Sequence, residues 1–183
     1  MSKVKLGIWI TVVLCVGVVF VGCSSKGIDP DLKPAATNET KVGTEVGNSA
    51  PDFRLTKIDG SQISLADLKG RPAVLIFWTA WCPICKEEAP LFNALAEKYE
   101  PRGVHVLGIN IQDSVARTEG GINDFGIRYR VARDADASVA RRYRVTGTPT
   151  IVLLDRQGVV HYFGNGLPSD YGERLDAMLA AGA

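Results

Sequence analysis

Two cysteines, Cys82 and Cys85, are separated by two residues at the point where an apolar run gives way to a helical pattern. At this spacing, two thiols at the start of a helix lie within one turn and can form a disulfide. The positive end of the helix dipole and the free backbone N–H groups stabilise a thiolate on the first cysteine. Cys82 is therefore the predicted nucleophile. Cys85, one turn further in, is suited to resolve the mixed disulfide that Cys82 forms with a substrate.

Other chemistries of a cysteine pair fit this sequence less well. A structural zinc ion needs four ligands, and only His105 and His161 could complete the set, because the other two cysteines lie near the N-terminus. Covalent haem attachment through C-x-x-C-H is excluded, since Lys86 takes the place of the histidine. A purely structural disulfide would gain little, because its closed loop is very short. A thiol peroxidase, or a copper or haem carrier that uses the pair as ligands, stays open.

The segments around the pair have the patterns of an α/β protein. The apolar, β-branched run at 73–78 predicts a strand covered on both faces. A helix is expected over 83–99, where Leu91, Leu95 and Tyr99 recur at four-residue steps. Strands are also expected at 52–55, 62–64, 104–110, 128–131, 150–154 and 159–163, and helices at 114–125, 138–143 and 169–180. Strand, helix and strand followed by a hairpin and a helix indicate a mixed sheet.

These motifs together resemble the thioredoxin superfamily, and more narrowly its extracytoplasmic TlpA/ResA branch. The resemblance is carried by Trp81-Cys82-Pro83-Ile84-Cys85 after a buried strand, Pro90 in the following helix, Gly147-Thr148-Pro149-Thr150 before the late hairpin, Ala50-Pro51-Asp52-Phe53, and residues 65–72. It covers about Gly47 to Ala180. It implies a thioredoxin fold, in which helices flank a mixed central sheet and a β-hairpin is added at the N-terminus.

The same resemblance implies an activity and a set of partners. The protein would be a thiol-disulfide oxidoreductase that reduces disulfides in exported proteins, with apocytochrome c as a typical substrate of the branch. A membrane-embedded thiol protein would supply the electrons. No cofactor and no metal ion are expected, and the protein is expected to be a monomer.

Three residues around the pair receive substrate-binding roles by this resemblance. Pro149 would be the cis-proline that faces the disulfide, and it would direct the backbone of Thr148 toward an incoming substrate strand. Trp81 would cover the sulfur atoms and the substrate groove.

Glu88 matches the acid that the ResA branch places in the pattern C-x-x-C-x-x-E-x-P. It follows Cys85 by three residues and therefore shares its helix face, where a carboxylate could take the proton of the resolving thiol. Ile76 stands where thioredoxins themselves carry a buried Asp, which makes Glu88 the leading candidate for the base. The alternative is a solvated helix acid such as Glu87.

The N-terminal segment has the pattern of an export signal. Lys3 and Lys5 precede 17 residues, from Leu6 to Gly22, that carry no charge. The run ends at Cys23 in a context that resembles the lipobox of bacterial lipoproteins, which predicts lipidation of Cys23. An uncut transmembrane anchor stays open, because the run reaches the lower limit of roughly 17–25 residues for a span. Simple secretion is the third alternative.

Composition divides the 183 residues into a signal peptide or membrane anchor at 1–22, a flexible tether at 23–48 and a thioredoxin-like domain at 49–183. The tether mixes Ser, Gly, Pro, Thr and charge without apolar periodicity. The chain has 21 basic and 20 acidic residues, so it lacks the basic excess of nucleic-acid-binding domains and no nucleic-acid partner is expected. The expected location is the periplasmic side of the cell envelope, anchored to the membrane.

Overall fold

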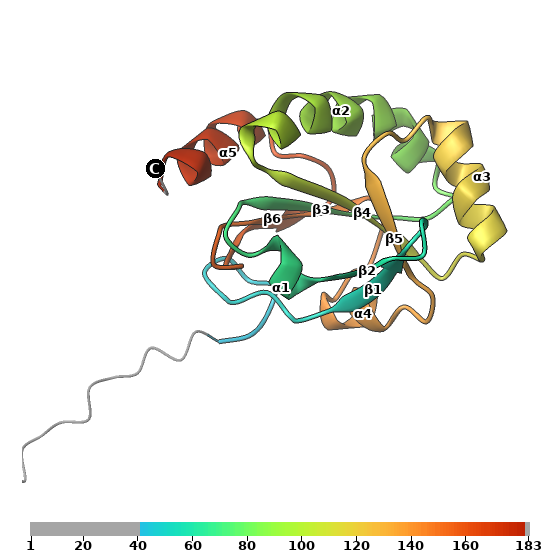
Figure 1. Ribbon diagram of the computed structural model, residues 1–183, viewed down its shortest axis with the longest axis horizontal. Coiled ribbons are helices and arrows are strands. Elements are labelled where there is room, and N and C mark those ends of the chain that lie inside the picture. The colour runs from blue at the N-terminus through green and yellow to red at the C-terminus, as the bar shows by residue number, and fades with distance from the viewer. Residues whose placement is uncertain (1–40, 182–183) are drawn as a thin grey trace, which may run out of the picture. The chain divides into compact units, whose positions relative to one another are not determined.

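The computed structural model describes residues 41–181, which form a seven-stranded sheet with helices on both faces (Figure 1). The strands are β1 (Arg54–Lys57), β2 (Gln62–Ser64), β3 (Ala73–Trp78), β4 (His105–Ile111), β5 (Arg130–Asp134), β6 (Thr150–Leu154) and β7 (Val160–Gly164). The helices are α1 (Leu65–Leu68), α2 (Pro83–Tyr99), α3 (Val115–Phe125), α4 (Ser138–Arg142) and α5 (Tyr171–Ala180), with a 3-10 turn at Glu100–Arg102. The predicted signal segment, Cys23 and most of the predicted tether lie outside the described residues.

The sheet is mixed, in the order β2-β1-β5-β4-β3-β6-β7. The central strand β3 pairs in parallel with β4 and antiparallel with β6, and β5 continues the parallel part beyond β4. All six residues of β3 are buried, as expected for a strand covered on both faces. This arrangement confirms the predicted α/β class and the thioredoxin fold, including the added β1–β2 hairpin.

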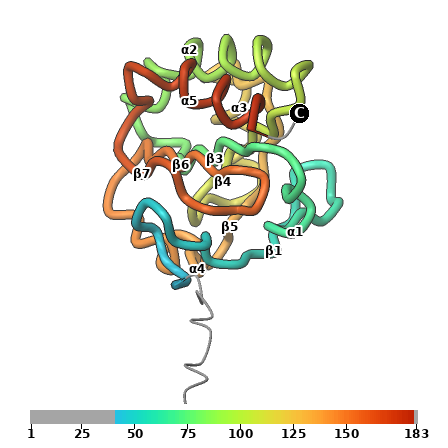
Figure 2. Tube along the Cα trace, turned by 90° about the vertical axis from the view of Figure 1, so that its left-hand side faces the viewer, coloured from blue at the N-terminus to red at the C-terminus, as the bar shows by residue number. Residues whose placement is uncertain are grey.

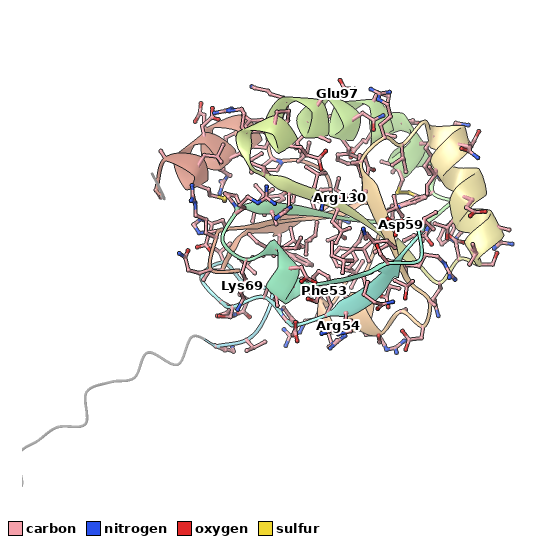
Figure 3. All side chains as sticks on the ribbon, in the orientation of Figure 1. Phe53, Arg54, Asp59, Lys69, Glu97 and Arg130 are labelled. Carbon is pink, nitrogen blue, oxygen red and sulfur yellow. A yellow bond between two sulfur atoms is a disulfide. The ribbon has the colours of Figure 1, made fainter. Side chains whose placement is uncertain are left out.

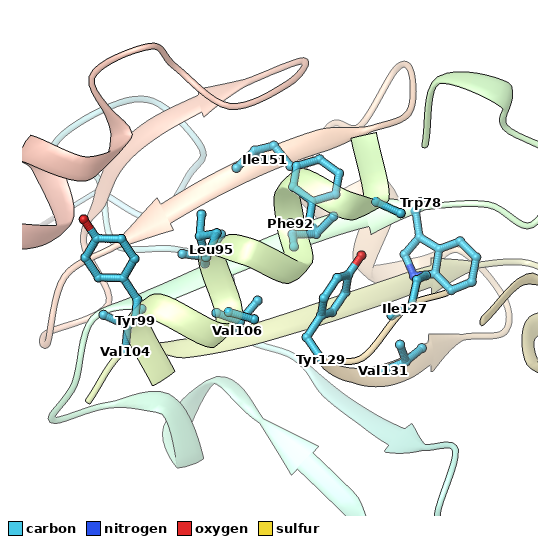
Figure 4. Close-up of a cluster of buried hydrophobic side chains, with 14 of the residues drawn as sticks. Trp78, Phe92, Leu95, Tyr99, Val104, Val106, Ile127, Tyr129, Val131 and Ile151 are labelled. Atoms are coloured by element: carbon cyan, nitrogen blue, oxygen red, sulfur yellow. The ribbon is translucent and has the colours of Figure 1, made fainter. Parts of the chain in front are cut away.

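Helices α2, α3 and α5 cover one face of the sheet, and Figure 2 shows α2 and α5 side by side from a second direction. The core on this face is rich in aromatic residues (Figure 4), and the rings of Trp78 and Phe125 lie 5.6 Å apart. The Tyr99 hydroxyl donates a 3.2 Å hydrogen bond to the carbonyl of Gly172, which ties α2 to α5. Cys82 and Cys85 belong to this core, so the packing that forms the fold also places the pair.

The opposite face is covered by α1, α4 and the chain that precedes β1 (Figure 1). Side chains fill the space on both sides of the sheet (Figure 3). Here the buried ring of Tyr143 lies 5.3 Å from that of Phe77, and its hydroxyl donates a 2.8 Å hydrogen bond to the carbonyl of Pro51. This bond fixes the chain leading into the added hairpin against the central strand.

Residues 41–48, which composition assigns to the tether, are hydrogen-bonded to the domain. The N–H of Gly47 donates to the carbonyl of Val160 at 2.8 Å, and the N–H of Val160 donates to the carbonyl of Asn48 at 2.9 Å. These bonds satisfy part of the outer edge of β7, which would otherwise be unpaired. The pairing uses backbone groups only, so side-chain composition does not reveal it.

Two helices differ from the sequence prediction at the level of single turns. The last helix begins at Tyr171 after Asp170, without a side-chain cap, whereas the predicted helix starts at residue 169. The short helix α1 is not among the predicted elements. At its start the Asp67 carboxylate accepts hydrogen bonds from the N–H of Ser64 at 2.8 Å and from the Ser64 hydroxyl at 2.6 Å. Within residues 41–181, no helix is long and apolar enough to cross a membrane.

Candidate active site

The cysteine pair occupies the junction between β3 and α2. Cys82 is the N-cap residue of α2 and Pro83 takes the first helical position, a combination that starts a helix well. The N–H of Cys85 donates to the sulfur of Cys82 at 3.1 Å. The two cysteines form a disulfide here, with Cα atoms 5.3 Å apart. In the reduced protein the same N–H and the helix dipole would stabilise a thiolate on Cys82.

The segment before β6 meets this junction from a distant part of the chain. The peptide bond between Thr148 and Pro149 is cis. The carbonyl oxygen of Thr148 lies 3.4 Å from the sulfur of Cys82, although the two residues are 66 positions apart in the sequence. The hydroxyl of Thr150 donates to the carbonyl of Gly147 at 2.6 Å and closes the turn around the proline.

Exposed apolar side chains surround the buried sulfur atoms. Trp81 is 71% exposed and Ile84 is 53% exposed, whereas Cys82 is only 4% exposed. Beside Cys82 lies an open cleft of about 240 Å³, lined by Ala80, Trp81, Cys82, Pro83, Lys86, Asp124 and Phe125. At its rim the ammonium group of Lys86 lies 2.7 Å from the carboxylate of Asp124 and links α2 to α3. Cys82, not Cys85, therefore borders the cleft.

Glu88 is half-buried on α2. Its Oε2 atom is buried, with no hydrogen-bond partner among the described residues. A side chain at Gly166 would place its Cβ only 3.5 Å from Oε1, so the loop after β7 passes close to this carboxylate. Burial, and to a smaller extent the charge of Glu87, raises the pKa of Glu88 above its usual value. This environment differs from that of a fully solvated helix acid.

A buried carboxylate that the sequence analysis does not identify supports the loop before the cysteines. Asp113 is 4% exposed, and its Oδ2 atom accepts hydrogen bonds from the N–H of Ala80 at 2.7 Å and from the amide of Asn110 at 2.9 Å. The hydroxyl of Thr118 in turn donates to Asn110 Oδ1 at 2.8 Å. Asp113 follows β4, whose carboxyl end lies beside that of β3. A polar residue directly after a predicted parallel strand is the sequence signal that could have identified Asp113, because functional groups gather at this edge of a parallel sheet.

The two histidines lie away from the cysteine pair. His105 begins β4, at the end of the sheet opposite to Cys82, and its Nδ1 atom is 3.0 Å from the guanidinium of Arg130. Burial, then the charges of Arg71 and Arg130, lowers the pKa of His105 to about 4. His161 lies 3.0 Å from Asp155. The possible zinc site of two cysteines and two histidines is therefore not assembled, and within residues 41–181 no group of three potential metal ligands gathers elsewhere.

Comparison with known proteins gives relatives with redox functions. The model of the AhpC/TSA family matches residues 46–163. Thiol-disulfide oxidoreductase ResA of Bacillus thuringiensis (strain Al Hakam) is 34% identical over 120 residues, which are 66% of this chain and 69% of that protein. ResA of Bacillus subtilis (strain 168) is 32% identical over 120 residues, which are 66% of this chain and 67% of that protein.

Solved structures with the same fold include two from Mycobacterium tuberculosis. A secreted disulfide oxidoreductase, homologous to Escherichia coli DsbE, has a TM-score of 0.58 and 30% identity; the match covers 70% of this chain and 95% of that one. The structure of DsbF in mixed oxidised and reduced forms has a TM-score of 0.61 and 29% identity; the match covers 72% of this chain and 95% of that one.

Removing the carboxylate of Asp113 should weaken the support of the loop before Cys82. We expect Asp113→Ala to lower the free energy of unfolding by about 1–3 kcal/mol, because the N–H of Ala80 loses its acceptor in a partly buried place. Asp113→Asn keeps a carbonyl oxygen in the same position, and its free energy of unfolding should fall clearly less. Denaturant unfolding of the two variants checks this, and equal losses would show that the hydrogen bond to Ala80 is not what matters.

Proposed function

Because this chain belongs to the AhpC/TSA family of the thioredoxin superfamily and is a thiol-disulfide oxidoreductase, we propose that it reduces disulfides in exported proteins through Cys82 and Cys85. The observation that carries the proposal is the position of the Cys82 sulfur. It caps α2, borders an open cleft and lies 3.4 Å from the carbonyl oxygen of Thr148, whose backbone would pair with an extended peptide.

The reaction transfers two electrons from the cysteine pair to the substrate. The Cys82 thiolate attacks one sulfur of the substrate disulfide; that disulfide breaks, a mixed disulfide forms, and the departing substrate sulfur takes a proton. Cys85 then loses its proton and attacks the Cys82 sulfur. The mixed disulfide breaks, the Cys82–Cys85 disulfide forms, and the second substrate sulfur leaves and is protonated. The substrate ends as two thiols and the enzyme as the disulfide.

The substrate would be held by its backbone and by apolar contacts. An extended peptide beside Thr148 and Pro149 would reach Cys82 with its own sulfur, and the exposed side chains of Trp81 and Ile84 would cover it. The substrate class we propose is a protein exported with a disulfide that must be opened, and apocytochrome c is the candidate drawn from the ResA resemblance. A membrane-embedded thiol protein would return the cysteine pair to its reduced form.

Glu88 is proposed as the group that takes the proton of Cys85 during the second step. The raised pKa of the Glu88 carboxylate lies closer to that of a thiol than the pKa of an ordinary surface acid does, and its buried Oε2 atom has no competing partner among the described residues. The position three residues beyond Cys85 keeps both groups on one face of α2.

The domain is proposed to act outside the cytoplasm at the membrane surface, attached through lipidated Cys23. One structural feature fits this arrangement. Residues 47–50 join the sheet at Gly158 and Val160, before and at the start of β7, which is the end of the sheet away from Cys82. A tether that reaches the domain there would leave the cleft beside Cys82 open to substrates.

Replacing the resolving cysteine should trap the substrate. In the Cys85→Ser variant the mixed disulfide on Cys82 has no internal thiol to release it, so it accumulates. We expect thiol-quenched cell envelopes to yield exported cysteine proteins, including apocytochrome c, bound covalently to the variant and released by dithiothreitol. Mass spectrometry of the purified adducts identifies them. The Cys82→Ser/Cys85→Ser double variant is the matched control and should yield none.

Two results would overturn this proposal. One is an absence of any trapped exported protein from the single variant. The other is a rapid reaction of the reduced protein with one equivalent of peroxide together with no reduction of peptide disulfides. The second result would favour a thiol peroxidase. Such enzymes place a threonine three residues before the reactive cysteine, and Thr79 holds that position before Cys82, with a buried hydroxyl that has no partner in residues 41–181.

The proton-transfer role of Glu88 predicts a specific loss in the second step. Glu88→Gln should slow the release of substrate from the mixed disulfide by at least about tenfold, because an amide cannot accept the thiol proton. In the native protein this release should become faster as the pH rises through the raised pKa of Glu88, and the variant should lack that rise. Stopped-flow single-turnover kinetics at a series of pH values measures the rate of this release. Glu87→Gln, a change at the exposed neighbouring acid, is the control; equal rates in both variants would contradict the role.

Lipidation of Cys23 makes a separate prediction. In a bacterial host supplied with labelled palmitate, the native protein should carry the label and sediment with the membranes, whereas Cys23→Ser should carry no label. Cys15→Ser changes a cysteine inside the apolar run and should keep the label. An unlabelled native protein that still sediments with membranes and retains Met1 would instead indicate an uncut anchor.

A further inference from the structure

The loop between β7 and α5 contacts the cis-proline segment through one side chain. The amide nitrogen of Asn165 donates to the carbonyl of Pro149 at 3.1 Å and lies 3.4 Å from the hydroxyl oxygen of Thr150. That hydroxyl donates in turn to the carbonyl of Gly147. Asn165 therefore stands at the start of a short chain of hydrogen bonds that ends on the other side of the proline.

The position of Asn165 relative to the sheet explains why a side chain is needed there. The last backbone pair between β6 and β7 joins Ile151 to Gly164. Beyond it, Pro149 lies outside both strands, and its carbonyl would have no partner from the sheet ladder. The Asn165 amide supplies that partner and extends the connection between the two strands toward Thr148.

The loop that carries Asn165 is itself held in place by β7. The Tyr162 hydroxyl donates to the carbonyl of Gly166 at 3.1 Å, and the tyrosine ring occupies the space that a side chain at Gly164 would need. Gly166 has a φ of +85°, a conformation that favours glycine. These contacts fix the loop before any substrate arrives, so the Asn165 amide is already aimed at Pro149.

We propose that Asn165 is a positioning residue that holds the Thr148–Pro149 backbone in place for an extended peptide substrate. The inference rests on the proposed function, since it concerns the peptide that this function requires. The hydrogen bonds of the Asn165 side chain go to the cis-proline segment and not to either sulfur atom. Asn165 therefore acts through Pro149, whose neighbour Thr148 faces Cys82. Its effect should therefore depend on whether the substrate uses the backbone of Thr148.

Two substrates of the reduced protein distinguish this role from a general effect on the cysteines. One is a peptide with an internal disulfide and an extended backbone. The other is bis(2-hydroxyethyl) disulfide, which has no backbone to pair with Thr148. For Asn165→Ala and for the isosteric Asn165→Asp, which lacks the donor, the rate constant with the peptide should fall about three- to tenfold, the loss of one ordinary hydrogen bond. The rate with the small disulfide should stay within about twofold of native.

Asn123→Ala is the matched control, because Asn123 is an exposed asparagine on α3 whose side chain makes no hydrogen bond within residues 41–181. It should leave both rates unchanged. If the Asn165 variants lose rate equally with both substrates, or with neither, the positioning role is overturned. The proposed function still holds in that case, provided that the native protein reduces the peptide. A native protein that reduces the small disulfide but not the peptide would overturn both.

Discussion

The hydrogen bond from the Cys85 N–H to the Cys82 sulfur is the contact on which the site depends, because it ties the reactive atom to the first turn of α2. It persists only if the junction between β3 and α2 is held still. The buried strand β3 supplies most of that rigidity, since neighbouring strands and packed helices hold it on every side. Packing and chemistry are therefore not separable here: the core that stabilises the fold also fixes the reactive sulfur.

The groups that complete the site come from separate elements at one end of the sheet. Asp113, after β4, holds the loop that leads to the cysteines, and Thr148, before β6, brings a backbone carbonyl to the sulfur. Asn165, after β7, holds that second segment. Asp113 and Asn165 each hold a backbone atom through a side-chain hydrogen bond, whereas Thr148 contributes its own backbone carbonyl. The site thus consists of two reactive side chains between backbone segments that hydrogen bonds hold in place. Such a site would suit substrates that share an extended main chain and differ in sequence.

The rim of the cleft beside Cys82 carries an ion pair and exposed apolar side chains. The formal net charge of the chain is +1, and the ion pair between Lys86 and Asp124 balances the charges at the rim of the cleft. Two exposed side chains beside the sulfur atoms, Trp81 and Ile84, are apolar. Recognition of a partner would then rest on backbone pairing and apolar contact rather than on long-range attraction.

The fold class, most elements and the redox pair follow from the residues alone, because apolar periodicity and the C-x-x-C spacing are local properties of the chain. Which distant groups meet the pair depends on how the chain packs in three dimensions. Asp113 and Asn165 act on backbone atoms of Ala80 and Pro149, and such contacts leave no periodic pattern. The pairing of residues 41–48 with β7 was equally hidden from composition, since it uses main-chain groups that every residue carries.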